Sequence, residues 1–438
     1  MARIGHRQRH DTRPRLHMAS LGKNRLVGLS KYAIVAHMDI LFISTSLPYP
    51  PNTGGAIRAH GIIEGLRLAG HHITLLCFHE GDIPADLGIT IHTIPIPHRS
   101  KWDRLKTLLF TRQADISKRL YSDVFAQKLI DLLSGHQYDL IQFEGIEAGC
   151  YLPIAKRHQP SAKLVFDTFN AEYMLQRNIF EIDRQSLKRL PMAVYSYLQI
   201  GRIKRYERHL CALADAVIAV SEEDAVLLRP LGDANKIHVI SSGIWVEEYA
   251  ENTTPMVLHH PAIVFTGKMD YRPNVDAMVW FIDEILPLIQ KKRADVHLYI
   301  VGQQPHARLE GFKAHPNITV TGRVNRVLPY LYGADVYIAP LRMGSGTRLK
   351  LLEAMACGCA IISTTIAASG LNEAVKSAMV IADSPSDIAH HILMLLDNRQ
   401  QRMMMGESAK KHVATYYDWS AILPHILDVY ARLGLKVD

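Results

Sequence analysis

Short apolar runs alternate along this chain with longer segments whose apolar residues recur at helical spacing. In the first half the runs occupy residues 39–44, 73–78, 139–143, 163–167, 215–220 and 237–240, and in the second half residues 262–266, 296–301, 317–320, 335–339 and 360–363. Continuous apolar strands separated by amphipathic helices are typical of a parallel sheet that is covered on both faces. The pattern therefore predicts an α/β chain.

The alternating series occurs twice, and the break between the two series predicts two domains. A chain of 438 residues is too long for one compact core. Residues 247–260 lack clear periodicity and include Asn-Thr-Thr-Pro at 252–255, so we place the linker there. We assign residues 38–250 to an N-terminal domain and residues 255–418 to a C-terminal domain.

The composition is that of a globular protein without a structural metal. Hydrophobic residues make up 48% of the chain and charged residues 21%, and no apolar run reaches the ~20 residues that a membrane-spanning helix needs. The five cysteines are scattered and odd in number, which favours reduced thiols over a disulfide framework. Cys357 and Cys359 lack a second ligand pair at zinc spacing, so we expect no metal site.

The net charge of +8 is concentrated at the N-terminus. Residues 1–37 contain eight Lys or Arg and one Asp, which leaves only +1 for the other 401 residues. A nearly neutral body argues against a nucleic-acid partner. The basic extension lacks periodicity, which predicts disorder. Because Met38 begins a clean strand, our hypothesis is that the extension reflects an upstream start codon.

The segment 340–358 combines a glycine-containing loop with the start of an amphipathic helix. It reads Gly-Ser-Gly-Thr-Arg-Leu-Lys at 344–350, and Thr347 is placed to cap the helix. Glycines let backbone amides approach an anion, and cations in a first helical turn oppose the helix dipole unless something negative binds there. The segment indicates a diphosphate site, and an ordinary turn with solvated cations is the alternative. Three residues at helical spacing would face the core: Leu349, Leu352 and Met355.

This segment resembles the C-terminal signature of glycosyltransferase family 4, and three further motifs resemble other landmarks of that family. The motifs lie in the expected order at 214–221, 265–276 and 320–324, and the resemblance spans nearly everything from Met38 onward. It implies the GT-B fold, in which two Rossmann-like domains face a cleft. It also implies that the last helix crosses back, so that residues 419–438 pack on the N-terminal domain.

The resemblance also implies which residues bind the donor. The helix glutamate of the family, here Glu353, accepts hydrogen bonds from both ribose hydroxyls. The cation after the first strand of the C-terminal domain, here Lys268 in place of the usual arginine, contacts the diphosphate. The expected donor-binding residues are Gly54, Gly55, Arg58, Lys268, Gly322, Gly344, Ser345, Gly346, Thr347, Arg348, Lys350 and Glu353.

Several positions depart from the family's pattern. Ser345 stands where the family has the first glutamate of a pair, Phe169 replaces a histidine, and Pro273 replaces a second cation. Glu144 ends a strand at a position that is often histidine in relatives. We take Glu144 as the candidate catalytic or sugar-binding residue, and a satisfied loop carboxylate is an equally good interpretation.

These observations predict a retaining glycosyltransferase. It would move a sugar from a UDP- or GDP-linked donor to a glycan or lipid-linked acceptor in cell-surface polysaccharide or glycoconjugate synthesis. The nucleotide sugar is a co-substrate, so no cofactor is expected, and no closely spaced acidic pair follows a strand, which predicts metal independence. A catalytically inactive sugar-nucleotide-binding scaffold is the main alternative, and a sugar-nucleotide epimerase is a weaker one.

Two basic stretches interleave Lys and Arg with large apolar side chains, at residues 99–119 and 184–210. They lead to the hypothesis of a cytoplasmic protein that attaches peripherally to anionic lipid at the inner face of the membrane. Basic helices that pack on the domain and are solvated outside are the alternative.

Overall fold

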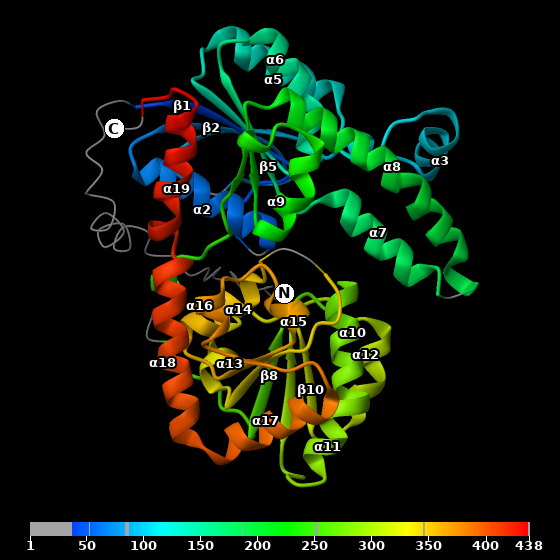
Figure 1. Cartoon of the computed structure of the whole chain (residues 1–438), viewed down its shortest axis with the longest axis vertical. Helices are drawn as coiled ribbons and strands as arrows, with labels where there is room; N and C mark the ends of the chain where they lie inside the picture. The colour runs from blue at the N-terminus through cyan, green and yellow to red at the C-terminus, as the bar shows by residue number, and fades with distance from the viewer. Residues whose placement is uncertain are drawn as a thin grey trace, which may run out of the picture.

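The computed structural model describes residues 37–436 apart from 52, 84–86, 186, 250–252 and 345–346. Two bodies, each built around one parallel sheet, lie one above the other (Figure 1). Apart from its last residue, the basic extension predicted at 1–37 lies outside the described residues, and so do Ser345 and Gly346.

The first sheet has seven parallel strands within the described residues, in the order β3-β2-β1-β4-β5-β6-β7. Side chains alternate between its two faces, as the pleat requires. Leu41 and Ile43 of β1 enter one core cluster, whereas Ile40 and Phe42 enter the cluster on the other face. Both faces are therefore covered. The strands are β1 (Asp39–Ser44), β2 (His72–Phe78), β3 (Thr90–Ile94), β4 (Leu140–Glu144), β5 (Lys163–Thr168), β6 (Ala216–Ala219) and β7 (Ile237–Val239).

The second sheet has six parallel strands among the described residues, in the order β10-β9-β8-β11-β12-β13. Eleven strands of the two sheets coincide with the predicted runs to within two residues at either end. The pattern missed β3 and β13, which are edge strands with few or partly exposed apolar side chains. The strands are β8 (Ala262–Thr266), β9 (His297–Val301), β10 (Ile318–Gly322), β11 (Val336–Ala339), β12 (Ile361–Ser363) and β13 (Val380–Ile381).

Helices connect the strands and cover both faces of each sheet (Figure 1). In the first body they are α2 (Gly54–Leu68), α3 (Lys101–Phe110), α4 (Ile116–Arg119), α5 (Asp123–Gly135), α6 (Leu152–His158), α7 (Glu172–Asp183), α8 (Leu190–Leu213) and α9 (Glu222–Leu228). In the second body they are α10 (Arg272–Trp280), α11 (Leu286–Gln290), α12 (Ala307–Glu310), α13 (Leu328–Gly333), α14 (Leu349–Ala356), α15 (Thr365–Ala368), α16 (Glu373–Lys376), α17 (Pro385–Asp397) and α18 (Arg399–Tyr416).

The last helix, α19 (Trp419–Arg432), crosses from the second body to the first and packs beside α2 (Figure 1). Its apolar stripe, which includes Leu423, Ile426 and Tyr430, is buried in the core that also contains β1 and β2. The crossover predicted from the family resemblance is confirmed. Gly61 of α2 makes the approach possible, because a Cβ at that position would lie 2.0 Å from the ring of Trp419.

The outgoing and returning connections between the bodies run side by side. Ile244 donates its backbone N–H to the carbonyl of Tyr417 at 2.9 Å, and Trp419 donates back to Ile244 at 3.1 Å. Asp418 caps α19 and also accepts the backbone N–H of Val246 at 2.9 Å. Hydrogen bonds thus tie the two connecting segments together. Both segments would have to bend if the angle between the bodies changed.

Candidate active site

The carboxyl ends of parallel strands place the predicted site residues of both bodies at their junction. In the first body, Ser44, Glu144 and Asp167 stand in register at the ends of β1, β4 and β5. Ligands of doubly wound sheets bind beyond these strand ends. Gly54 at the start of α2 lies opposite Leu349 of α14, because a Cβ on Gly54 would be 3.8 Å from the leucine Cδ1. The junction of the bodies therefore brings the two sets of motifs together.

Helix α14 holds two polar side chains of the signature, Lys350 and Glu353. Its apolar face is buried, as predicted, with Leu352 and Met355 fully enclosed. The Nζ of Lys350 donates to Asn274 Oδ1 at 2.7 Å and lies 4.4 Å from the ring centroid of Phe265. Burial, reinforced by a nearby arginine charge, lowers the pKa of Lys350 to about 7. The lysine is therefore held in a defined position at the carboxyl end of β8.

Glu353 lies one helical turn beyond Lys350 and is bonded to the segment that links the two bodies. Tyr249, in the 3₁₀ turn Val246–Tyr249, donates its hydroxyl to Glu353 Oε1 at 3.0 Å. Burial raises the pKa of Glu353, while the hydrogen bond from Tyr249 and the charge of Lys350 oppose that rise. Tyr249 was not predicted as a site residue, because nothing in the sequence indicates which side chain reaches a helix that begins about 100 residues later.

The loop after β8 carries Lys268 on an exposed turn. Lys268 Nζ forms an ion pair with Asp270 Oδ2 at 3.2 Å, and both side chains are about half exposed. A Cβ at Gly302, after β9, would lie 1.7 Å from the carbonyl oxygen of Gly267. Two strand-end loops thus touch backbone to backbone, and Gly302 is a structural requirement that the sequence analysis missed.

Gly344, in the loop before α14, has a left-handed backbone. Gly344 has φ of +118°, and a Cβ there would meet the guanidinium of Arg348 at 2.5 Å. Burial lowers the pKa of Arg348, while the charge of Asp224 in the other body opposes the shift. Gly322 also has positive φ, +68°, with open space on its side-chain face.

The prediction that Thr347 caps α14 is wrong. The N-cap position is Arg348, which makes no side-chain cap hydrogen bond. Thr347 Oγ1 instead donates to the carbonyl of Val220 in the first body, at 3.4 Å. The threonine therefore bridges the two bodies instead of capping the helix.

Arg58 does not face the junction as a phosphate-binding cation. It is 1% exposed, and its guanidinium donates to both carboxylate oxygens of Asp167, with the shortest distances at 2.9 Å. Its Nη1 donates to the carbonyl of Ile240 at 3.0 Å and to Ser242 Oγ at 3.3 Å. The assignment of Arg58 as a donor-binding residue is therefore corrected: its donors are used to tie α2 to β5 and to the segment that follows β7.

Glu144 is fully buried next to that ion pair. Its Oε1 accepts from Gln142 Nε2 at 2.7 Å, and Gln142 Oε1 accepts in turn from the hydroxyl of Tyr430 on α19. Burial and the neighbouring carboxylate of Asp167 raise the pKa of Glu144. The side chain lies under the crossover helix with 0% exposure, so its predicted contact with the reacting sugar is not available in this arrangement.

Phe169, which replaces the family's histidine, packs against Gly55 of α2 and against Gly145. A Cβ on Gly55 would meet its ring at 3.4 Å, and a Cβ on Gly145 would meet it at 3.0 Å. The ring thus fills the space that these two glycines leave at the ends of β4 and β5. An apolar wall replaces a polar group on the first body's side of the site.

Metal ligands and membrane-spanning helices are both absent from the described residues. No group of three or more His, Cys, Asp or Glu among them is arranged to hold a metal ion. In the same part of the chain, none of the helices has the length and apolar character needed to cross a bilayer. All five cysteines are free thiols, as predicted.

Two family models match the chain, one for each body. The model for Glycosyltransferase Family 4 matches residues 52–248, and that for Glycosyl transferases group 1 matches residues 260–398. An uncharacterized 44.6 kDa protein in the cps region of Klebsiella pneumoniae is 20% identical over 410 residues, which are 88% of this chain and 98% of that protein. A phosphatidyl-myo-inositol mannosyltransferase of Propionibacterium freudenreichii is 28% identical over 236 residues, 50% of this chain and 57% of that protein.

Solved structures with similar architecture cover nearly the whole chain. Anabaena HepE in complex with UDP has a TM-score of 0.62 at 13% identity, over 90% of this chain and 100% of that one. Sucrose-phosphate synthase from Thermosynechococcus elongatus has a TM-score of 0.65 at 17% identity, over 91% and 99%. At such identities the likeness establishes the fold, and it confirms the predicted pair of facing Rossmann-like domains.

Proposed function

We propose that this chain, whose two bodies match models of Glycosyltransferase Family 4 and Glycosyl transferases group 1 and whose fold is GT-B, transfers a sugar with retention from a nucleotide-diphosphate donor. The acceptor would be a glycan or a lipid-linked sugar in cell-surface polysaccharide or glycoconjugate synthesis. The observation that carries the proposal is the pairing of Lys350 and Glu353 on one face of α14, at the junction of the bodies. UDP or UDP-glucose bound to HepE, and the mannosyltransferases among the relatives, support a sugar-nucleotide donor.

The arrangement divides donor binding between charge and hydrogen bonding. Lys350, Lys268 and the amides beside Gly344 supply positive potential for a diphosphate, while the Glu353 carboxylate can accept from two ribose hydroxyls. In the transfer step the acceptor hydroxyl bonds to the anomeric carbon as the bond to the diphosphate breaks on the same face. The departing phosphate oxygen takes the hydroxyl proton, so the step needs neither a protein base nor a metal ion.

A donor screen tests the proposal directly. The purified full-length chain is incubated with a panel of UDP- and GDP-sugars, and the released nucleotide is measured with and without EDTA. We expect slow hydrolysis of one donor, unchanged by EDTA, and release of the sugar with its original anomeric configuration by NMR. Glu353→Ala should abolish it, whereas Glu373→Ala, an exposed helical glutamate paired with Lys376, should not. Release of the opposite anomer would refute retention.

The same screen separates the two alternatives. A catalytically inactive scaffold would bind a nucleotide sugar tightly and release no nucleotide even with acceptor glycans present. The substitutions at Ser345, Phe169 and Pro273 are the features that favour it. An epimerase would instead convert the sugar while it is still attached to the nucleotide or release it with an inverted C2 centre. Either product pattern would replace the transferase proposal.

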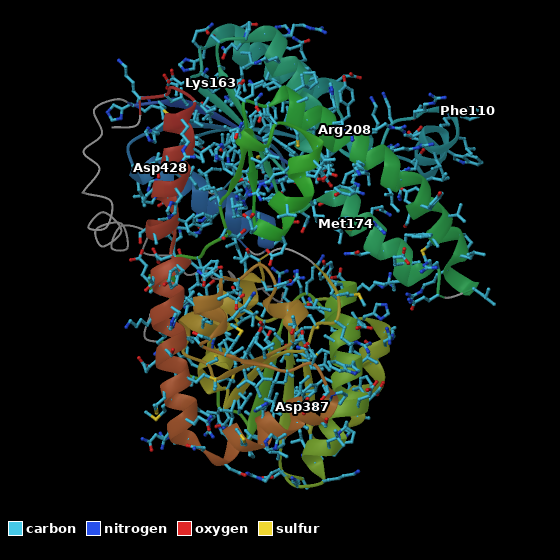
Figure 2. The ribbon with its side chains drawn as sticks, in the orientation of Figure 1. Phe110, Lys163, Met174, Arg208, Asp387 and Asp428 are labelled. Carbon is cyan, nitrogen blue, oxygen red and sulfur yellow. The ribbon has the colours of Figure 1, made fainter. Side chains whose placement is uncertain are left out.

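A platform on the first body supports peripheral attachment to the inner face of the cytoplasmic membrane. Helix α3 and the far ends of α7 and α8 project away from the sheet, and Phe110 lies at the outer end of α3 (Figures 1 and 2). The exposed apolar side chains of this projection include Trp102, Leu109, Phe110, Leu187, Met192 and Tyr197. The two basic stretches, residues 99–119 and 184–210, run through the same elements, which suits anionic lipid.

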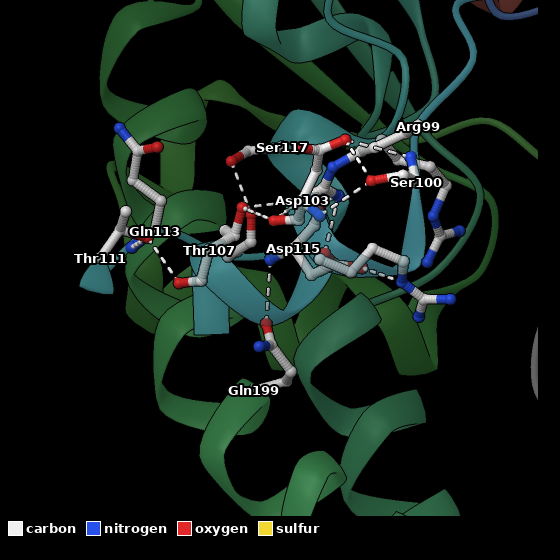
Figure 3. A network of polar contacts seen from close by, with 12 residues as sticks. Arg99, Ser100, Asp103, Thr107, Thr111, Gln113, Asp115, Ser117 and Gln199 are labelled. Carbon is white, nitrogen blue, oxygen red and sulfur yellow. Dashed lines mark hydrogen bonds and ion pairs between the residues drawn. The ribbon is translucent and has the colours of Figure 1, made fainter. Parts of the chain in front are cut away.

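Hydrogen bonds hold the platform in a fixed position against α8, so its exposed apolar side chains do not belong to a loosely attached helix. Asp115, 4% exposed, accepts from Arg99 at 2.7 Å and from the Tyr195 hydroxyl at 3.0 Å, and its backbone N–H donates to Gln199 of α8 at 2.9 Å (Figure 3). Arg202 of α8 donates to three backbone carbonyls at the end of α3 and beyond it. The apolar side chains are thus held outward on a fixed base.

Vesicle flotation tests the attachment. The full chain should float with vesicles of phosphatidylcholine and phosphatidylglycerol at low salt, and salt should weaken binding. The double variant Trp102→Ser and Phe110→Ser should lose most of it. Tyr416→Ser, which removes an exposed aromatic ring on α18, serves as the control. Equal flotation of all three proteins would contradict a role for the platform.

A further inference from the structure

Asn274 connects the two cations on the second body's side of the site. It lies in the first turn of α10 and is 4% exposed. Its Nδ2 donates to the backbone carbonyl of Lys268 at 2.8 Å, and its Oδ1 accepts from Lys350 Nζ at 2.7 Å. One amide therefore fixes both the loop that carries the first cation and the ammonium group of the second.

The space around this amide is filled so closely that the arrangement has little freedom. A Cβ at Gly267 would lie 2.7 Å from Asn274 Nδ2 and 2.7 Å from Lys350 Nζ. The residue before Lys268 can thus be only a glycine without moving the amide or the ammonium group. On the other side, the ring of Phe265 lies against Lys350 Nζ.

The partner of Lys350 is a neutral amide and not a carboxylate, which decides whether the lysine keeps its charge for a ligand. An amide oxygen orients an ammonium group without neutralising it, whereas a carboxylate at the same place would form an ion pair. Within the described residues, Lys350 forms no ion pair with any carboxylate, so its charge stays available to an anion. A cation whose direction is fixed by a neutral acceptor is suited to contact a phosphate that arrives later.

We propose that Asn274 is a positioning residue for nucleoside-diphosphate binding, which sets Lys350 and the Lys268 loop in the geometry that receives the two phosphates. The inference rests on the proposed donor chemistry and adds a residue to it. Asn274 itself would touch no substrate atom and would act through the two lysines. It should therefore affect ligands with phosphates and leave the recognition of the nucleoside unchanged.

Calorimetry with UDP and GDP on the full chain, from pH 6 to pH 9, tests the inference. Asn274→Ala should weaken binding of the preferred diphosphate about tenfold, the usual cost of losing a hydrogen bond to a charged group. Binding of the matching nucleoside, followed by saturation-transfer NMR, should not change. The control is Asn317→Ala, which removes an amide that also bonds two backbone carbonyls but lies just before β10, away from the site.

The pH profile distinguishes positioning from a merely structural role. The groups that face Lys350 are Arg348 at the N-cap of α14, Glu353 on α14, the ring of Phe265 on β8 and Asn274 on α10. Diphosphate affinity should fall as pH rises above about 7, because the lysine loses its proton. Asn274→Asp adds an opposite charge that favours the protonated lysine, so this fall should move to higher pH.

Each outcome decides the matter. Unchanged diphosphate affinity in Asn274→Ala would overturn the inference, and so would an equal loss of nucleoside and diphosphate binding, which indicates general collapse. An Asp variant with the wild-type pH profile would also contradict it. If the wild-type protein bound neither UDP nor GDP, the proposed function itself would be refuted. If the wild type bound a diphosphate and the Asn274 variants bound it equally well, only the inference about Asn274 would be refuted.

Discussion

Replacing Gly61 with alanine should detach the crossover helix from the first body. The new Cβ would lie 2.0 Å from Trp419 Cε2 and Nε1 and 2.5 Å from Cζ2, whereas non-bonded carbon atoms prefer about 3.5–4.0 Å. The indole ring would have to withdraw by about 1.5 Å. Trp419 is 1% exposed and is among the largest fully buried side chains, so withdrawal opens a void at the start of α19.

Two opposing contributions set the loss in free energy of unfolding that Gly61→Ala should cause. Deleting a buried tryptophan side chain costs about 3–5 kcal/mol, and a displaced ring retains part of its contacts. Alanine gains about 1 kcal/mol over glycine in a helix interior. We therefore expect the free energy of unfolding of the first body to fall by about 2–3 kcal/mol, which corresponds to a drop of about 5–10 °C in its melting temperature.

Thermal unfolding of the full chain followed by circular dichroism measures this drop. Gly201→Ala is the matched control, because Gly201 is also inside a helix but a Cβ added there would meet no other atom within 4 Å. That variant should be as stable as the parent or more stable by up to about 1 kcal/mol. If Gly61→Ala melted at the same temperature as Gly201→Ala, the argument that α19 packs on α2 through this glycine would be refuted.

Three further predictions concern buried charges. Burial lowers the pKa of Lys350 from 10.5 to about 7, so the unfolded chain binds more protons between these values and the free energy of unfolding should rise with pH there; urea titrations of Lys350→Met should show a flatter profile. Asp167→Asn leaves Arg58 buried without its counter-ion and should cost about 3–5 kcal/mol in the same titrations. Glu144→Gln should change stability by less than about 1 kcal/mol and leave donor hydrolysis intact, because burial raises the pKa of Glu144 toward the neutral acid; a large loss of turnover would restore it as a catalytic candidate.

The sequence predicted the fold well because its signals are local. Strand-like runs bounded by helices indicated nearly every strand, and the family resemblance implied that the last helix crosses back. Lys350 and Glu353 were each expected to bind the donor, and the structure places them three residues apart on one face of α14. Edge strands such as β3 were missed because half-exposed strands carry a weaker apolar pattern.

The side-chain partners that cross the molecule could not be read in the same way. Arg58 lies one turn into the helix that follows the glycine pair, where a cation can point either to the strand ends or under the sheet. Its partner Asp167 is 109 residues away, and the sequence alone does not pair them. Tyr249 and Asn274 were missed for the same reason, because their partners belong to elements that only the fold brings close.

The buried network under α19 explains why a strand-end glutamate was mistaken for a catalytic candidate. Two carboxyl groups, of Glu144 and Asp167, lie near one guanidinium, that of Arg58, and all three side chains are at most 1% exposed. Asp167 takes the ion pair, so a second buried negative charge would have no counter-ion within the described residues, and a neutral Glu144 is the arrangement that costs least. Tyr430 then links this network to the crossover helix through Gln142. The polar residues at this strand end thus hold α2, β5, the segment after β7 and α19 together, and the donor chemistry that we propose rests on the second body and its helix α14.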